Sequence, residues 1–249
     1  MSEQTIQSQD INVDNVFKSF YAVPDYQREY VWETEQIEQF LGDINGELAD
    51  EAATAPEYFI GSIVVCPSPS DDGVMELIDG QQRMTTLFLS LCAIRDRFKD
   101  LEEKPPGALK PQIAAISTDL HGQDQFRYRL DLQYEDSGDV LEKIGAEEWD
   151  GLVKRRTRSV SNIANAYEVV GEFLRSEFGN DIKRLKSFYG YLNHKVKLIR
   201  IETQDVAKAL KVFETINDRG VGLDSMDLLK NLLFMNTSVP KKSRIDSIG

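Results

Sequence analysis

The chain has 249 residues, 41% of them hydrophobic and 29% charged, with a formal net charge of -13 at pH 7. This composition is typical of a globular protein in water, and no apolar run approaches the roughly 18 residues needed to span a bilayer. The polar, acidic N-terminal stretch differs from a secretion signal, and Cys66 and Cys92 have the spacing of neither a zinc site nor a disulfide framework. We therefore expect a cytoplasmic protein.

Hydrophobic periodicity predicts helices and strands in alternation over the first hundred residues. The predicted elements are a short helix over 13–20, a strand over 21–24, a helix over 35–48 capped by Thr34, strands over 58–66 and 74–78, and an amphipathic helix that follows Arg83. The turn-rich segment PSPSDDG joins the two longer strands, so we expect them to be neighbours in one sheet.

The pattern is less regular between residues 100 and 160, where prolines and polar residues indicate a loop-rich insertion or the start of a helical subdomain. Further along the chain, the predicted elements are helices over 161–178 and 182–192, a half-buried strand over 195–202, a helix from Asp205 to 216 and a last helix from 224 or 225 to 234.

Charge is distributed unevenly along the chain. Residues 1–60 contain 13 acidic and 2 basic side chains, whereas residues 151–200 contain 11 basic and 4 acidic ones. A basic segment suits a face that meets DNA phosphates, although a solvated helical surface with acidic neighbours explains it equally well. The residues expected to bind DNA on the first interpretation are Arg155, Arg156, Arg158, Lys183, Arg184 and Lys186.

The sharpest local motif is Asp79-Gly-Gln-Gln-Arg83, which follows a predicted strand and opens a predicted helix. A helix that begins after a glycine turn presents unpaired N–H groups and the positive end of its dipole, which together attract anions. Arg83, Thr85 and Thr86 add donors for a phosphate, and Asp79 is placed to hold a divalent cation or to orient water. The alternative is that Asp79 and Thr85 merely cap the helix.

A second motif, Pro24-Asp-Tyr-Gln-Arg-Glu-Tyr-Val-Trp32, interleaves large aromatic residues with polar ones. Aromatic faces and guanidinium planes stack well on flat bases, so Tyr26, Gln27 and Trp32 could contact a nucleobase beside Arg28. The same aromatic residues could equally fill the junction between the strand and the next helix.

A third motif, Phe213-Glu-Thr-Ile-Asn-Asp-Arg-Gly-Val-Gly-Leu223, ends a predicted helix at two glycines. Asn217 and Arg219 stand where that exit could point into a cleft, although Asn217 to Gly220 could be a plain helix C-cap. The signatures of P-loop nucleotidases, zinc proteases and serine hydrolases do not occur in the sequence.

Taken in order, PDYQREYVW, FIGSIVV, ELIDGQQRMTTL and FETINDRGVGLDSMDLLKN resemble the N-terminal domain of the GmrSD-type restriction endonuclease family over roughly residues 13–234. The resemblance implies an α+β fold of the ParB/sulfiredoxin-like kind, with a small mixed sheet, flanking helices and a helical extension. We expect a core formed by residues 1–104, a helical extension or insertion over 105–194, and a completion of the core by residues 195–249.

Members of that family are typically nucleoside-triphosphate hydrolases in defence systems that cut modified phage DNA, for example phosphorothioate or glucosylated DNA. The resemblance therefore implies modified DNA, a nucleotide and an HNH-type nuclease domain, absent from these 249 residues, as partners. We expect Asp79, Gln82 and Arg83 to be catalytic, with Mg²⁺ on Asp79 and with Asp79 and Gln82 positioning the attacking water. The residues expected to bind the nucleotide are Tyr26, Gln27, Arg28, Gly80, Gln81, Thr85, Thr86, Asn217 and Arg219.

Three alternatives stay open at this point. The domain could read modified DNA without hydrolysing a nucleotide, it could itself nick DNA with a metal at the DGQQR motif, or it could be an assembly scaffold whose site has decayed. The first alternative predicts DNA binding that weakens steeply with salt, and the second predicts metal-dependent relaxation of supercoiled plasmid.

Overall fold

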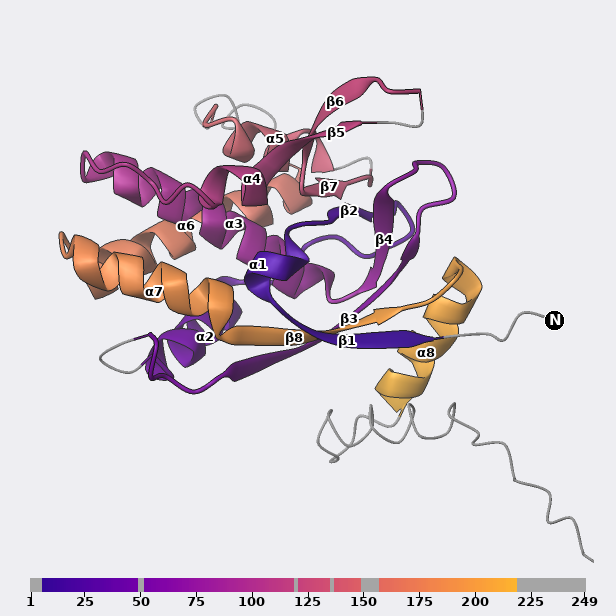
Figure 1. The fold of residues 1–249 in the computed structure, drawn as a ribbon, viewed down its shortest axis with the longest axis horizontal. Helices are drawn as coiled ribbons and strands as arrows, with labels where there is room; N and C mark the ends of the chain where they lie inside the picture. The colour runs from indigo at the N-terminus through magenta and orange to yellow at the C-terminus, as the bar shows by residue number, and fades with distance from the viewer. Residues whose placement is uncertain (1–5, 49–51, 119–120, 135–136, 149–156, 219–249) are drawn as a thin grey trace, which may run out of the picture.

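The computed structural model describes residues 6–48, 52–118, 121–134, 137–148 and 157–218. Its main feature is a six-stranded sheet that combines strands from both ends of the chain (Figure 1). The strands lie in the order β1 (Gln7–Asn12), β8 (Val196–Glu202), β3 (Tyr58–Pro67), β4 (Val74–Asp79), β2 (Phe20–Val23) and β7 (Leu130–Leu132).

The sheet is mixed. The β1–β8 and β3–β4 pairs are antiparallel, as expected for the two strands joined by the PSPSDDG turn, whereas β8–β3, β4–β2 and β2–β7 are parallel. Helices flank this sheet, so the predicted α+β class with a small mixed sheet is confirmed.

Two apolar clusters lie against the sheet. The larger one joins the sheet to the long central helix α3 (Gln81–Asp100). Both α3 and α2 (Thr34–Gly46) pack on α6 (Arg158–Phe178). The short helix α1 (Val13–Val16) packs on α7 (Ile182–His194). The smaller cluster lies under α8 (Val206–Asp218), which packs on β3 and β4. Because β4 leads directly into α3 and α8 packs on β4, the junction between β4 and α3 lies near α8.

The segment between residues 105 and 148 contains more regular structure than its sequence pattern indicates. It forms α4 (Leu109–Ile113), a two-stranded sheet of β5 (Ala114–Thr118) and β6 (Asp124–Tyr128), the edge strand β7 and the helix α5 (Val140–Gly145). The prediction of a loop-rich insertion or the start of a helical subdomain did not include these strands, because they are short and no side chain of β5 or β6 is buried, which leaves little alternation to detect.

The structure contains a further strand that the sequence did not predict, and it corrects the predicted cap of α2. Strand β1 was not predicted, because five of its six residues are polar and Ile11 is the one buried residue in it. The N-cap of α2 is Glu33 rather than Thr34, since the Glu33 N–H donates to Gln36 Oε1 at 2.9 Å and the two residues form a capping box. The helix expected over 224–234 lies outside the described residues.

The two cysteines, Cys66 and Cys92, lie in the interior. Both are free and buried, and burial raises the pKa of the Cys66 thiol to about 11 and that of the Cys92 thiol to about 12. Both thiols therefore stay protonated at neutral pH. Within the described ranges, no helix combines the length and the apolar character that crossing a membrane requires.

Candidate functional site

The DGQQR motif lies at a sharp transition between β4 and α3. Asp79 is the last residue of β4, and Gly80 is the N-cap of α3 with φ of 88°, a left-handed conformation that favours glycine. A Cβ on Gly80 would lie 2.6 Å from Ile63 Cγ2 and 3.0 Å from the Ser62 carbonyl oxygen of β3. The close approach of the two backbones therefore requires glycine here.

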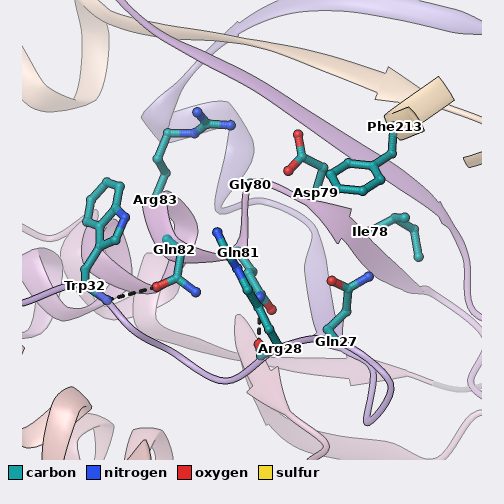
Figure 2. Close-up of a pocket in the computed structure, with 10 residues that line it drawn as sticks. All are labelled: Gln27, Arg28, Trp32, Ile78, Asp79, Gly80, Gln81, Gln82, Arg83 and Phe213. Carbon is teal, nitrogen blue, oxygen red and sulfur yellow. Dashed lines mark hydrogen bonds between the residues drawn. The ribbon is translucent and has the colours of Figure 1, made fainter. Parts of the chain in front are cut away.

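A pocket of about 450 Å³ opens at this transition (Figure 2). Its walls come from the segment before α2, from the end of β4, from the first turn of α3 and from α8. The lining residues are Gln27, Arg28, Trp32, Ile78, Asp79, Gly80, Gln81, Gln82, Arg83 and Phe213. Residues from all three motifs that the sequence singled out thus meet in space.

The Arg83 guanidinium is held in place at the edge of the pocket. Nη2 donates a hydrogen bond to the Ser62 carbonyl oxygen. Gly61, at φ of 107°, leaves room for this contact, because a Cβ there would lie 2.8 Å from Arg83 Nη1. Burial lowers the pKa of Arg83 from its ordinary value and the charge of Asp79 opposes this shift, but a guanidinium remains charged at any physiological pH.

Asp79 presents its carboxylate to the pocket beside the Phe213 ring (Figure 2). Among the described residues, the carboxylate has no hydrogen-bond or ion-pair partner, so both oxygens can accept from a ligand. The described residues contain no group of three or more metal-ligating side chains. The Asp79 carboxylate is a suitable oxygen ligand for Mg²⁺, which commonly takes one or two protein carboxylates and completes its coordination with water or phosphate oxygens.

The two glutamines of the motif are engaged with the segment before α2. Gln81 Nε2 donates to the Arg28 carbonyl oxygen at 2.6 Å, and Gln82 Nε2 donates to that of Glu29 at 3.1 Å. Gln82 Oε1 accepts from the N–H groups of Val31, at 2.9 Å, and Trp32, at 3.2 Å. Gln82 is therefore occupied by main-chain bonds, and the geometry gives no support to its predicted role of orienting water.

The aromatic motif divides between pocket, core and surface. Arg28 and Gln27 line the pocket, together with Trp32, whose ring lies 5.4 Å from that of Phe40. Tyr30 is buried instead, with its hydroxyl 2.9 Å from Thr86 Oγ1. Tyr26 is 54% exposed, lies outside the pocket lining and donates to a carboxylate oxygen of Glu76 at 3.2 Å, so its predicted contact with the nucleotide is not supported.

Thr85 and Thr86 do not reach the pocket. They are 1% and 0% exposed, and Thr86 Oγ1 donates to the Gln82 carbonyl oxygen at 2.9 Å. Their prediction as phosphate ligands is corrected accordingly: the helix turns both side chains into the core, because one turn past its start α3 is surrounded by protein on nearly all sides.

The third motif contributes Phe213 to the site, a residue that was not among the predicted ligand-binding residues. Phe213 of α8 lines the pocket. Asn217 lies one turn further along α8, and its side chain is outside the described part of the structure, as is the whole of Arg219. The i, i+4 spacing of Phe213 and Asn217 was the available signal, since such residues share a helix face.

The residues expected to bind DNA do not form one described surface. Arg155 and Arg156 lie outside the described residues. Arg158 begins α6, whereas Lys183, Arg184 and Lys186 lie in α7, which starts just after α6 ends. At 1.5 Å per residue, the 21 residues of α6 separate the two groups by about 30 Å.

The family model for the GmrSD restriction endonuclease, N-terminal domain, matches residues 4–234. The chain belongs to this family. The resemblance inferred from four ordered motifs is therefore confirmed, and the chain carries the N-terminal domain of a restriction system. A search of curated protein sequences found no match.

Proposed function

We propose that the pocket at the start of α3 binds and hydrolyses a nucleoside triphosphate, and that this GmrSD N-terminal domain couples hydrolysis to the sensing of modified DNA. The observation that carries the proposal is the meeting in one pocket of Arg28, Arg83 and the Asp79 carboxylate, which pairs with none of the residues that the structure describes. Two cations and one free carboxylate match a ligand that is both polyanionic and able to bind a metal ion.

The first turn of α3 supports binding of phosphate. The first helical hydrogen bond runs from the Met84 N–H to the Gly80 carbonyl oxygen at 3.0 Å, so the preceding N–H groups of the turn have no partner within the helix. These groups and the positive end of the helix dipole lie in the same pocket as Arg28 and Arg83. A volume of about 450 Å³ falls in the range of small-molecule sites, and Trp32 and Phe213 offer apolar walls to a base.

Phosphoryl transfer mainly needs positioning of the reactants and neutralisation of charge, so this set of side chains is sufficient without a histidine. Arg83, fixed on Ser62, and Arg28 would bind the phosphate oxygens, and Asp79 would orient the attacking water. A Mg²⁺ ion held by Asp79 and the substrate would supply further charge neutralisation.

The test is phosphate release from ATP, GTP, CTP and UTP by the 249-residue chain with Mg²⁺, with and without phosphorothioate DNA. We expect release by the unsubstituted chain and at least about a hundredfold less by Arg83→Ala, which removes a charge-assisted contact at the reacting group. Arg175→Ala is the matched control, since Arg175 is exposed on α6 away from this pocket. Full activity of a folded Arg83→Ala protein would contradict the proposal.

A second variant separates binding from chemistry. Asp79→Asn retains the shape of the side chain but loses its charge, so we expect nucleotide binding to persist while release of phosphate falls. Isothermal titration with a non-hydrolysable triphosphate measures the first, and the release assay measures the second. Equal loss of both would assign Asp79 to binding alone.

A further inference from the structure

The side chains of Gln81 and Gln82 form a bridge between α3 and residues 28–32, the segment that precedes α2. We name residues 28–32 the Arg28 loop. This loop belongs to no helix or strand, because β2 ends at Val23 and α2 begins at Thr34. The two glutamine amides make four hydrogen bonds to its main chain, at Arg28, Glu29, Val31 and Trp32.

Two other contacts fix the middle of the Arg28 loop from behind. Asn162 of α6 donates its side-chain N–H to the Tyr30 carbonyl oxygen at 2.9 Å, and the Tyr30 hydroxyl meets Thr86. By contrast, the Arg28 side chain is exposed and lines the pocket, and no described residue pairs with its guanidinium. The main chain of the loop is thus anchored while its one cationic side chain remains available to a ligand.

We propose that Gln81 and Gln82 are positioning residues, which set the Arg28 guanidinium over the pocket instead of contacting the reacting groups. This inference rests on the proposed function for its substrate, but the anchoring itself does not depend on it. It explains why the glycine turn is followed by two amides. Each one extends from the first turn of α3, which also carries Arg83, to the strand-to-helix connection. The motif thereby holds cationic groups from two distant segments in one geometry.

The chemistry of the bridge requires glutamine. Gln82 uses its carbonyl oxygen to accept from two adjacent N–H groups and its amino group to donate to a carbonyl oxygen, and among unbranched side chains of this length a primary amide provides both. Glutamate cannot donate, and methionine has a similar length but makes neither kind of bond. Because Gln82 is 5% exposed and Gln81 is 8% exposed, groups left unpaired by a substitution would have little access to water.

The first experiment tests the anchoring without reference to activity. Hydrogen exchange is measured on the whole chain and on Gln82→Met, with Gln39→Met as the control, since Gln39 is exposed on α2. We expect the Val31 and Trp32 amides to exchange at least about tenfold faster in Gln82→Met only, because each loses its acceptor. Unchanged exchange of both amides would overturn the inference.

The second experiment is a double-mutant cycle on phosphate release, with Gln81→Met, Arg28→Ala and the double variant. We expect Gln81→Met to raise KM for the nucleotide about fivefold, the worth of one lost hydrogen bond, with a smaller change in kcat. In the Arg28→Ala background the same substitution should change KM by less than about twofold, because its effect passes through Arg28.

The outcomes separate this inference from the function on which it rests. Independent, multiplying effects of Gln81→Met and Arg28→Ala would overturn it, since Gln81 would then contact the nucleotide itself. No hydrolysis by the unsubstituted chain would overturn the proposed function, and the exchange experiment would still decide whether the amides hold the Arg28 loop.

Discussion

Gly80 meets two structural requirements of the site, a left-handed backbone turn and close packing against β3. It lies between β4 and α3 as the N-cap of the helix, and it lets the backbone pass close to Ile63 and Ser62 of β3. The sequence predicted a glycine turn with an anion site at this position, because a strand, a glycine and an amphipathic helix follow one another directly. The predicted pairing of the two longer strands implied that β3 lies beside β4, but it did not give the register that brings Ser62 and Ile63 against Gly80.

We expect Gly80→Ala to destabilise the protein by about 2–4 kcal/mol, because a Cβ would be strained at a positive φ and would overlap Ile63. Urea denaturation followed by circular dichroism measures the loss. Gly42→Ala is the control: Gly42 lies within α2 with no atom within 4 Å of an added Cβ, so this change should stabilise the helix by about 0.5–1 kcal/mol. Equal stability of both variants would refute the expectation.

Site residues were predictable from the sequence where their role depends on local order along the chain, and not where it depends on contacts with distant segments. Asp79 and Arg83 followed from local order along the chain, which places them on either side of a helix start. The hydrogen bonds of Gln82 and Thr86 could not be predicted in this way, because both side chains bond to a loop some fifty positions earlier in the sequence. A polar side chain near a helix start looks alike in sequence whether it meets a ligand or a neighbouring main chain.

At the scale of elements, long helices and buried strands were predictable and short exposed ones were not. The apolar faces of α6 and α7 repeat at helical spacing, and β3 is a continuous β-branched and aromatic run. Strands such as β5 and β7 derive their stability from neighbours that the local sequence does not specify.

The surroundings of α7 favour the solvated-surface interpretation of its basic residues. Lys186 pairs with Glu103 at 3.4 Å, and Arg184 donates to the Glu177 carbonyl oxygen and lies over the Phe178 ring. Its N-cap, Asp181, adds a negative charge at the same end. Lys186 and Arg184 thus have partners within the chain, as expected of a solvated helical surface.

We expect the triple substitution of Lys183, Arg184 and Lys186 by alanine to change the Kd for a duplex by less than about twofold. The slope of log Kd against log salt should change by less than about one, since few phosphate contacts would be lost. Fluorescence anisotropy between 50 and 200 mM salt provides the measurement, with Arg158→Ala as a comparison at the far end of α6. A fall of the slope by about three would instead assign all three residues to DNA.

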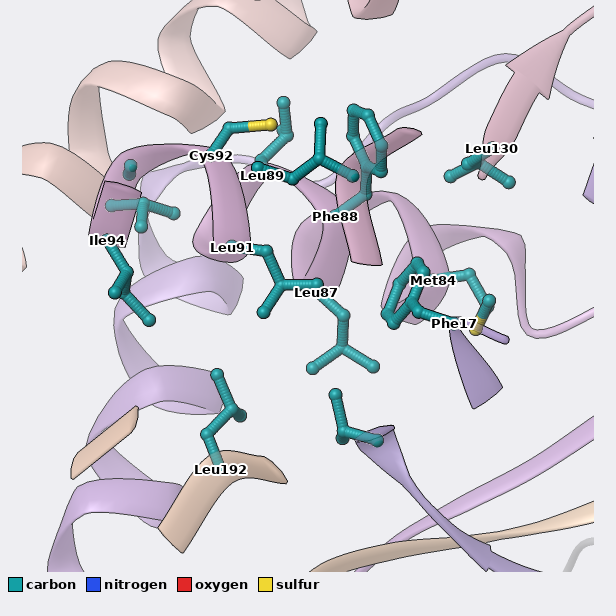
Figure 3. Packing of buried hydrophobic residues seen from close by; sticks show 14 of the residues in the cluster. Phe17, Met84, Leu87, Phe88, Leu89, Leu91, Cys92, Ile94, Leu130 and Leu192 are labelled. Carbon is teal, nitrogen blue, oxygen red and sulfur yellow. The ribbon is translucent and has the colours of Figure 1, made fainter. Parts of the chain in front are cut away.

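At the scale of the whole molecule, one apolar core contains residues from all three predicted ranges, 1–104, 105–194 and 195–249. Phe17 and Leu87 come from the first range, and Leu130 and Leu192 from the second (Figure 3). Leu198 of β8 adds the third. The extension and the core thus share buried surface instead of meeting at a polar boundary.

This shared core predicts one cooperative unfolding transition. Circular dichroism reports mainly on the helices, and in a Trp149→Phe variant fluorescence reports on Trp32 beside the pocket, since the chain has two tryptophans. The urea midpoints from the two probes should coincide. Two separated midpoints would show that residues 105–194 form a unit with a stability of its own.

The position of β8 also determines when this protein can fold during synthesis. β8 separates β1 from β3 in the sheet, yet it is translated after almost every other strand and helix that flanks them. At about 5–20 residues per second, the ribosome holds a nascent chain with β1 unpaired for on the order of 10–40 s, and one edge of β3 stays open for about two thirds of that interval. Open edges of this kind bind other strands, so the newly made chain passes through an interval of exposure to chaperones and to aggregation that ends only when β8 emerges.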